Sequence, residues 1–323
     1  MDEAFTREPF PSRPRIVFMG TPQFAVPTLK TIIREKYEIL DVVVQPDRPK
    51  GRGRKLSPPP VKVVAQENRL DVLQPERLDE RFIEAIDPLR PDLLVVIAFG
   101  QIIPGAVLNS ARFGGINIHA SLLPCYRGAA PIQWAIINNE KTTGLTTMFM
   151  DEGLDTGPIL LQQEVEIREG ETAGELHDRM AALAPGLLIK TLKGLAEGTV
   201  KAIAQDDSLA TYASKITKEQ GMIDWSWPAE QLYGLIRGLD PWPGASTFMN
   251  GRPLKLFGCL LAETSGKGLS PGRVKDFTEK GIEIETGMGT VIVKEFQSPG
   301  KRRMPAGAFI QGSRIGPGSI LGN

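Results

Sequence analysis

The chain has 323 residues, which exceeds the length that a single hydrophobic core usually supports, so we expect two domains. Hydrophobic residues make up 41% and charged residues 24%, as in ordinary soluble proteins, and the longest apolar runs are too short to span a bilayer. The formal net charge is zero, so a nucleic-acid partner would need local basic patches, and two distant cysteines without a C-x-x-C pair argue against zinc and a disulfide scaffold.

The N-terminal half alternates apolar runs with segments of helical periodicity. Residues 1–14 contain acids and lack an apolar core, which predicts a disordered tail and not a targeting peptide. A helix is expected at 27–37. Strands are expected at 15–20, 39–45, 91–100 and 115–120. Buried strands separated by helices predict an α/β domain with a mostly parallel, Rossmann-like sheet covered on both faces.

The pattern continues past Gly128 with one more helix, two strands and a long helix. The expected ranges are a helix at 129–139 and strands at 143–150 and 158–167. Thr172 and Glu175 form a capping box that opens the long helix. Pro185 lies inside that helix, so we expect the helix to be broken or kinked there.

The character of the chain changes near residue 205. Residues 204–215 have the composition of a linker, and 228–239 predict one helix. Asn250-Gly251 is a hairpin signal, and short glycine-bounded strands follow it. We therefore expect an α/β domain over 15–205 and a small β-barrel or sandwich over 206–323, with an OB-like barrel among the candidates.

The stretch INIHASLLPCYRG, residues 116–128, places two polar side chains at a strand end. Asn117 and His119 are two residues apart, so they share one face of the strand. The carboxyl ends of strands are where open α/β sheets bind ligands. An amide can donate to a carbonyl oxygen and an imidazole can carry a proton, while a structural hydrogen-bonded pair is the equally weighted alternative.

Two further stretches are rich in charge. DEGLDTGP contains Asp155 in a glycine-rich connection that could bring a carboxylate to His119, although loop acids are usually only solvated. QPDRPKGRGRKLSPPP, residues 45–60, is a basic loop directly after a strand, and it could bind phosphates or be a solvated, mobile loop. Neither a Walker A motif nor G-x-G-x-x-G is present, which weakens an ATP or nicotinamide hypothesis.

Together these stretches resemble the methionyl-tRNA formyltransferase family of folate-dependent formyltransferases. The resemblance covers nearly the whole chain from Arg15, including IDWS at 223–226 and DPWPGA at 240–245. The run Asn-x-His-x-Ser-Leu-Leu-Pro with a distant Leu-Asp-x-Gly is specific to folate-dependent formyltransferases and formyl hydrolases. The basic loop and the C-terminal barrel separate the tRNA enzymes from those relatives. Asp240 is a departure, since Asn is expected there in many members.

The resemblance implies that 10-formyltetrahydrofolate donates a formyl group to the α-amino group of initiator methionyl-tRNA, for translation initiation. It implies that Asn117 and His119 stabilise the charge on the formyl oxygen in a tetrahedral intermediate, and that Asp155 orients His119 and helps to move the amine proton. The implied folate-binding residues are Phe99, Gly100, Gln101, Ile102, Ser121, Leu122, Leu123, Pro124 and Asp151. The implied tRNA-binding residues are Arg48, Lys50, Arg52, Arg54 and Lys55.

No metal and no membrane are expected to take part, and we expect a monomer in the bacterial cytoplasm, with an organellar matrix as the alternative. The first 205 residues are expected to fold alone and bind the folate. The nearest alternative function changes only the acceptor, to a sugar-nucleotide amine, a purine precursor or water. A non-catalytic RNA-binding module and a nicotinamide-dependent oxidoreductase are the alternatives from other classes.

Overall fold

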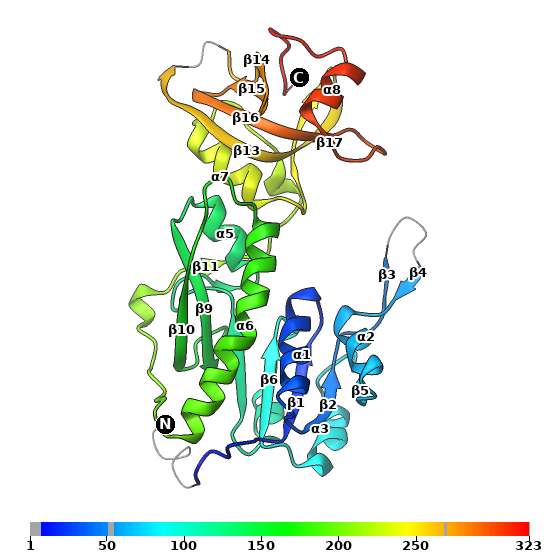
Figure 1. Ribbon diagram of the computed structural model, residues 1–323, viewed down its shortest axis with the longest axis vertical. Coiled ribbons are helices and arrows are strands. Elements are labelled where there is room, and N and C mark those ends of the chain that lie inside the picture. The colour runs from blue at the N-terminus through cyan, green and yellow to red at the C-terminus, as the bar shows by residue number, and fades with distance from the viewer. Residues whose placement is uncertain (1–7, 51–54, 268–269, 323) are drawn as a thin grey trace. The chain divides into compact units, whose positions relative to one another are not determined.

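The computed structural model describes residues 8–50, 55–267 and 270–322, and residues 1–7 of the predicted tail lie outside the described residues. The chain divides into two compact units (Figure 1). The first unit runs through Gly128 and includes Gly144–Val165 and His177–Tyr212. The second unit contains Ala129–Thr143, Glu166–Leu176 and the chain from Ala213 onward. Each unit is described separately below.

The first unit is built on a seven-stranded sheet in the order β10-β9-β7-β6-β1-β2-β5. Its strands are β1 (Ile16–Gly20), β2 (Ile39–Val43), β5 (Val72–Leu73), β6 (Leu93–Ile97), β7 (Gly115–His119), β9 (Thr142–Phe149) and β10 (Ile159–Glu166). β1, β2, β5, β6 and β7 are parallel, and β9 runs antiparallel to β7. Every residue of β1 and β6 is buried, as their continuous apolar runs require. The predicted α/β fold class is confirmed.

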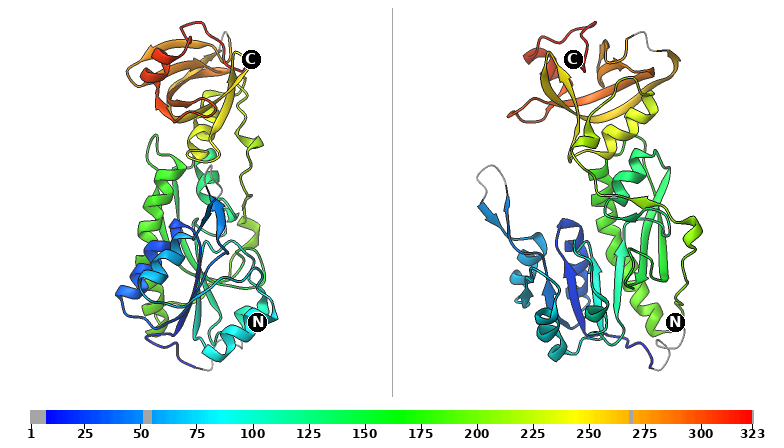
Figure 2. Two further views of the ribbon diagram at one scale, coloured as in Figure 1. Left: turned by 90° about the vertical axis from the view of Figure 1, so that its right-hand side faces the viewer. Right: turned by 180° about the vertical axis from the view of Figure 1, so that it is seen from behind.

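Helices cover both faces of this sheet (Figure 2). They are α1 (Val26–Arg34), α2 (Pro60–Glu67), α3 (Glu80–Ile86), α4 (Gly105–Leu108) and α6 (Ala173–Ala196). Thr172 and Glu175 form the predicted capping box at the start of α6, where the Thr172 backbone N–H donates a hydrogen bond of 2.8 Å to Glu175 Oε2. The predicted break at Pro185 does not occur, since α6 is a single helix of 24 residues. Buried side chains on both sides of the proline, such as Met180 and Leu188, hold the helix together despite the lost hydrogen bond.

The second unit contains an antiparallel sheet and several helices. The sheet order is β12-β13-β16-β15-β14, with β17 paired to β16. The elements are α5 (Pro131–Ile137), α7 (Ala229–Gly238), β12 (Ala245–Met249), β13 (Arg252–Lys267), β14 (Val274–Thr278), β15 (Gly281–Glu285), β16 (Met288–Gln297), β17 (Met304–Pro305) and α8 (Ala306–Gly312). Asn250 and Gly251 have φ of 51° and 69°, which fits the predicted hairpin turn between β12 and β13. Ile320 and Leu321 bridge Arg273, just before β14, and Met249 of β12, so the C-terminal residues join the two edges of the sheet.

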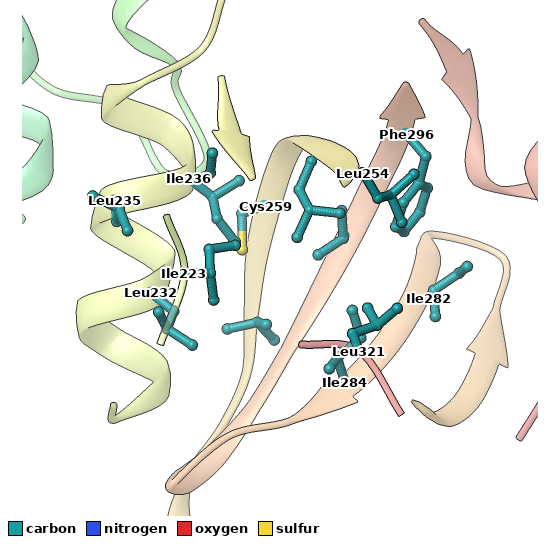
Figure 3. Packing of buried hydrophobic residues seen from close by; sticks show 14 of the residues in the cluster. Ile223, Leu232, Leu235, Ile236, Leu254, Cys259, Ile282, Ile284, Phe296 and Leu321 are labelled. Atoms are coloured by element: carbon teal, nitrogen blue, oxygen red, sulfur yellow. The ribbon is translucent and has the colours of Figure 1, made fainter. Parts of the chain in front are cut away.

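The core of the second unit lies between α7 and this sheet (Figure 3). Ile236 of α7 points toward Cys259 of β13. Burial raises the pKa of Cys259 to about 12, so this thiol stays protonated and unreactive at neutral pH. The buried Asp240, the departure noted in the sequence, accepts hydrogen bonds of 2.6 and 3.0 Å from Arg303.

Two segments that precede residue 205 belong to the second unit because of close contacts with α7. A Cβ atom on Gly234 would lie 2.3 Å from the carbonyl oxygen of Ile137, so glycine is needed where α5 meets α7. The Arg237 guanidinium, which is 3% exposed, donates to the Glu171 carbonyl at 3.0 Å and to Asn139 Oδ1 at 2.8 Å. Arg237 thereby joins both early segments to α7.

Candidate active site

The site starts from β7, which ends in the interior of the sheet between β6 and β9. Asn117 pairs with Val96 on one side and Met148 on the other, and His119 pairs with Thr146. His119 is 6% exposed and Asn117 is half-buried. Within the residues that the structure describes, the Asn117 side chain makes no hydrogen bond, so its amide is available to a ligand.

One nitrogen of the His119 ring is hydrogen-bonded, and the other faces a carboxylate. Nε2 lies 2.9 Å from the Tyr126 carbonyl oxygen, which can only accept, so Nε2 carries the hydrogen. Nδ1 faces Asp155 Oδ2 at 3.6 Å, too long for a hydrogen bond but within ion-pair range. A proton added at Nδ1 would therefore sit beside a carboxylate, which stabilises positive charge on the ring.

Asp155 reaches His119 from the connection between β9 and β10. Its side chain is 14% exposed, and Oδ2 accepts a hydrogen bond of 2.8 Å from the Gly128 backbone N–H. Its backbone is left-handed, with φ of 55°. Gly157 follows, where a Cβ would lie 1.8 Å from the Phe149 carbonyl oxygen, so only glycine fits. In the sequence Asp-x-Gly, the aspartate is thus needed for its carboxylate beside His119, and the glycine is needed because the backbone leaves no room for a Cβ.

Sequence reasoning missed Gln205 and Arg127, which support this loop. Gln205 Nε2 donates to the carbonyl oxygens of Asp155 at 2.8 Å and Gly157 at 2.7 Å. Gln205 Oε1 accepts from Arg127, which is 2% exposed. Gln205 lies in the predicted linker, where no local pattern marks it. Its partners are 50 and 48 residues away in the chain, so only the fold reveals it.

The predicted folate-binding residues near β6 form an exposed turn. Phe99 is buried at 2% exposure, whereas Ile102 is 81% exposed. Gly100 has φ of 89°, which favours glycine there. Gln101 donates to the Glu76 carbonyl at 3.4 Å. The large exposed side chain of Ile102 is the one apolar group of this turn that a ligand could cover.

The predicted folate-binding residues after β7 are mostly engaged within the protein. The Ser121 hydroxyl donates to the Cys125 carbonyl at 2.6 Å. The Leu123 N–H donates to Thr146 Oγ1 at 3.1 Å, and its carbonyl accepts from Gln162 at 2.8 Å. Leu122 and Pro124 are half-buried, and Asp151 Oδ1 folds its own loop by accepting from the Gly153 N–H and the Thr156 hydroxyl.

The basic loop begins and ends as a short antiparallel hairpin, β3 (Arg48–Lys50) and β4 (Lys55–Ser57). Arg48 is exposed, whereas Arg52, Arg54 and the side chains of Lys50 and Lys55 lie outside the described residues. The base of the hairpin is fixed by Asp47, which pairs with Lys62 at 2.9 Å and accepts from Gln74 at 2.8 Å. The Gln74 and Lys62 hydrogen bonds lower the pKa of Asp47, so it stays charged near neutral pH.

Among the residues that the structure describes, no group of three or more His, Cys, Asp or Glu side chains could hold a metal ion. In the same ranges, no helix has the length and apolarity needed to cross a membrane.

Two family models together match most of the chain. Residues 14–192 match the family model described as formyl transferase, and residues 215–314 match the formyl transferase C-terminal domain. The chain is 51% identical over 310 residues to a methionyl-tRNA formyltransferase of Citrifermentans bemidjiense, covering 95% of this chain and 96% of the relative. It is 50% identical over 308 residues to one from Pelobacter propionicus, covering 95% and 96%.

Solved structures show the same fold at low identity. An N-formyltransferase from Helicobacter canadensis, in complex with folinic acid and dTDP-3-aminofucose, aligns with a TM-score of 0.67 at 20% identity, covering 86% of this chain and 98% of that one. HypX from Aquifex aeolicus, in complex with tetrahydrofolic acid, aligns with a TM-score of 0.64 at 18% identity, covering 92% and 47%.

Proposed function

Because the chain belongs to the formyl transferase family, in its methionyl-tRNA formyltransferase branch, we propose that it moves the formyl group of 10-formyltetrahydrofolate to the α-amino group of initiator methionyl-tRNA. The names of the relatives support the acceptor. The folate ligands of structures with this fold support the donor. The bacterial sources of the relatives support a place in the bacterial cytoplasm.

Asn117 is the group proposed to stabilise the reacting oxygen. Attack of the amine on the formyl carbon places negative charge on the formyl oxygen. The Asn117 amide has donors and no recorded partner among the described residues, so it can aim an N–H at that oxygen without breaking another bond. The expectation that His119 also donates to this oxygen would require its Nε2–H to leave the Tyr126 carbonyl.

His119 and Asp155 are proposed to handle the proton. The attacking amine loses a proton and the departing folate nitrogen gains one, so a group that can accept and return a proton is needed between them. Nδ1 of His119 is the free ring position, and the Asp155 carboxylate 3.6 Å away would stabilise the charged ring. This is the observation that carries the proposal: at the end of β7 an imidazole faces a carboxylate, and an amide with no partner among the described residues lies two residues earlier on the same strand.

The acceptor is tested by offering several amines with one donor. Labelled 10-formyltetrahydrofolate is mixed with methionyl-tRNA, a dTDP-amino sugar, a purine precursor amine, or buffer alone. Transfer to methionyl-tRNA at a rate far above the others supports the proposal. Faster transfer to the amino sugar, the acceptor type in one structural neighbour, would assign the chain to that chemistry instead.

A further inference from the structure

The loop that carries Asp155 is at the surface, and yet its carboxylate is fixed. The neighbouring Leu154 is 55% exposed, so little apolar packing holds the loop. The left-handed backbone of Asp155, with φ of 55°, is unfavourable for most L residues. Contacts from elsewhere must therefore maintain the 3.6 Å separation from His119 Nδ1.

Gln205 supplies these contacts on the backbone side of the loop. Its amide nitrogen has two hydrogens, and they bond the carbonyl oxygens of Asp155 at 2.8 Å and Gly157 at 2.7 Å. The two bonds fix the peptide group that follows Asp155 and the one that follows Gly157. Asp155 is further held by the bond from the Gly128 N–H to its Oδ2, at 2.8 Å.

Arg127 fixes the orientation of the Gln205 amide. Its Nε and a terminal nitrogen donate to Gln205 Oε1 at 3.1 and 2.7 Å, and it also pairs with Asp207 at 2.8 Å. An arginine can only donate, so the amide oxygen must face Arg127 and the amide nitrogen must face the loop. The guanidinium is 2% exposed, so competing water is excluded from this contact.

The segment around Arg127 also contacts both proposed catalytic side chains. The carbonyl of Tyr126 accepts from His119 Nε2, and the N–H of Gly128 donates to Asp155 Oδ2. The backbone of this segment and the Arg127–Gln205 pair therefore close a ring of hydrogen bonds through Asp155, and the same segment bonds His119.

We propose that Arg127 and Gln205 are positioning residues that set the geometry of His119 and Asp155. This rests on the proposed function. Since Gln205 acts through the Asp155 loop, Gln205→Leu should lower kcat by about 10- to 100-fold and leave KM for folate and methionyl-tRNA within about 3-fold. Gln205→Glu, which keeps the acceptor and loses both donors, should behave alike. Arg127→Lys loses the two-pronged contact of the guanidinium with Gln205 Oε1. Its kcat should lie between the kcat of Gln205→Leu and that of wild type.

A kinetic test uses these variants with Gln66→Glu as the matched control, because Gln66 is exposed on α2 and takes the same chemical change. Thermal unfolding of each variant identifies any that have lost the fold. Unchanged kcat in folded Gln205→Leu and Gln205→Glu would overturn the proposal.

A second test needs no substrate. The chain has two histidines, so His177→Gln leaves His119 as the single source of imidazole NMR signals. At fixed pH, Gln205→Leu in this background should shift these signals toward their positions in Asp155→Ala, and Gln66→Glu should not. Signals that stay at wild-type positions would overturn the proposal whatever the kinetics. Failure of the wild-type protein to formylate methionyl-tRNA would instead overturn the proposed function and leave this test unaffected.

Discussion

At the residue scale, the proposed roles of Asn117, His119 and Asp155 can be separated from folding by kinetics. Each change to alanine should lower kcat by roughly 10²- to 10⁴-fold, because each group acts on charge or protons at one reacting carbon. Folate affinity should change much less. The loss of kcat in the double and triple variants should be far smaller than the product of the losses in the single variants, because the groups act as a unit. Near-normal turnover of Asp155→Ala would rule out its part in moving the proton.

Asp41 in β2 makes stability depend on pH. Burial, with a smaller contribution from Asp71, raises its pKa to about 6, against the lowering effect of backbone hydrogen bonds. Oδ1 has no partner among the described residues. The folded state thus binds the proton more tightly than the unfolded chain, so this contribution is complete below about pH 4 and is lost as pH rises through about 6.

The expected loss from Asp41 ionisation is about 3 kcal/mol of unfolding free energy in total, and about 2 kcal/mol of it falls between pH 4 and 6. Asp41→Asn cannot ionise and should remove this part of the slope. Urea unfolding from pH 4 to 7 measures the difference between wild type and variant, with Asp71→Asn as a milder control. A difference that stays constant over this range would show that Asp41 does not titrate in the folded protein.

Residues with a local signal could be predicted from the sequence, and residues defined by long-range contacts could not. Asn117 and His119 were found because alternation places both on one face of a strand. Gln205 had no such signal, since its proposed role depends on hydrogen bonds to carbonyl groups about 50 residues earlier in the chain. The link from Asp240 to Arg303 spans 63 residues and was likewise invisible.

At the element scale, the hairpin of β3 and β4 carries the proposed contact with tRNA. Arg52, between Gly51 and Gly53, should reach the acceptor stem, where a planar guanidinium can bridge two acceptors or stack on a base. Arg52→Ala should weaken tRNA binding by about 1–3 kcal/mol and leave folate binding intact, and Arg52→Lys should restore it only in part.

Arg52→Ala should also change the salt dependence of tRNA binding, whereas Arg52→Lys keeps the positive charge and should leave it unchanged. Each charge removed should make the slope shallower by no more than about one phosphate contact. The measurement is tRNA affinity over a salt series for wild type, Arg52→Ala and Arg52→Lys. If affinity and slope are unchanged in Arg52→Ala, the loop does not bind tRNA and its charged side chains are only solvated.

Elements with continuous apolar runs or helical periodicity were predictable, whereas their connections were not. The central strands follow directly from sequence, but the antiparallel direction of β9 depends on pairing with β7. Pro185 predicted an interruption of α6 that packing along the helix prevents. The segment predicted as a linker contains β11 (Tyr212–Ala213), which pairs with β8 (Arg127–Gly128).

At the scale of the whole molecule, a fragment ending at Tyr212 tests the division of labour. It keeps Gln205 and should still bind folate. It loses Arg237, which holds 129–143 and 166–176, so its Tm should fall, by about 2–4 °C for each kcal/mol lost. It should also lose productive use of methionyl-tRNA, because the second unit would supply part of a wide phosphate-contacting surface. Full activity of the fragment with methionyl-tRNA would contradict this.

The central claim is formyl transfer to an aminoacylated tRNA by the groups at the end of β7. The most direct measurement is transfer of a labelled formyl group from 10-formyltetrahydrofolate, with wild type and Asn117→Ala assayed side by side on methionyl-tRNA and on uncharged tRNA. We expect wild type to place label on methionyl-tRNA, Asn117→Ala to do so roughly 10²-fold or more slowly, and neither protein to label uncharged tRNA. Equal rates for the two proteins, or no transfer by wild type, would contradict it.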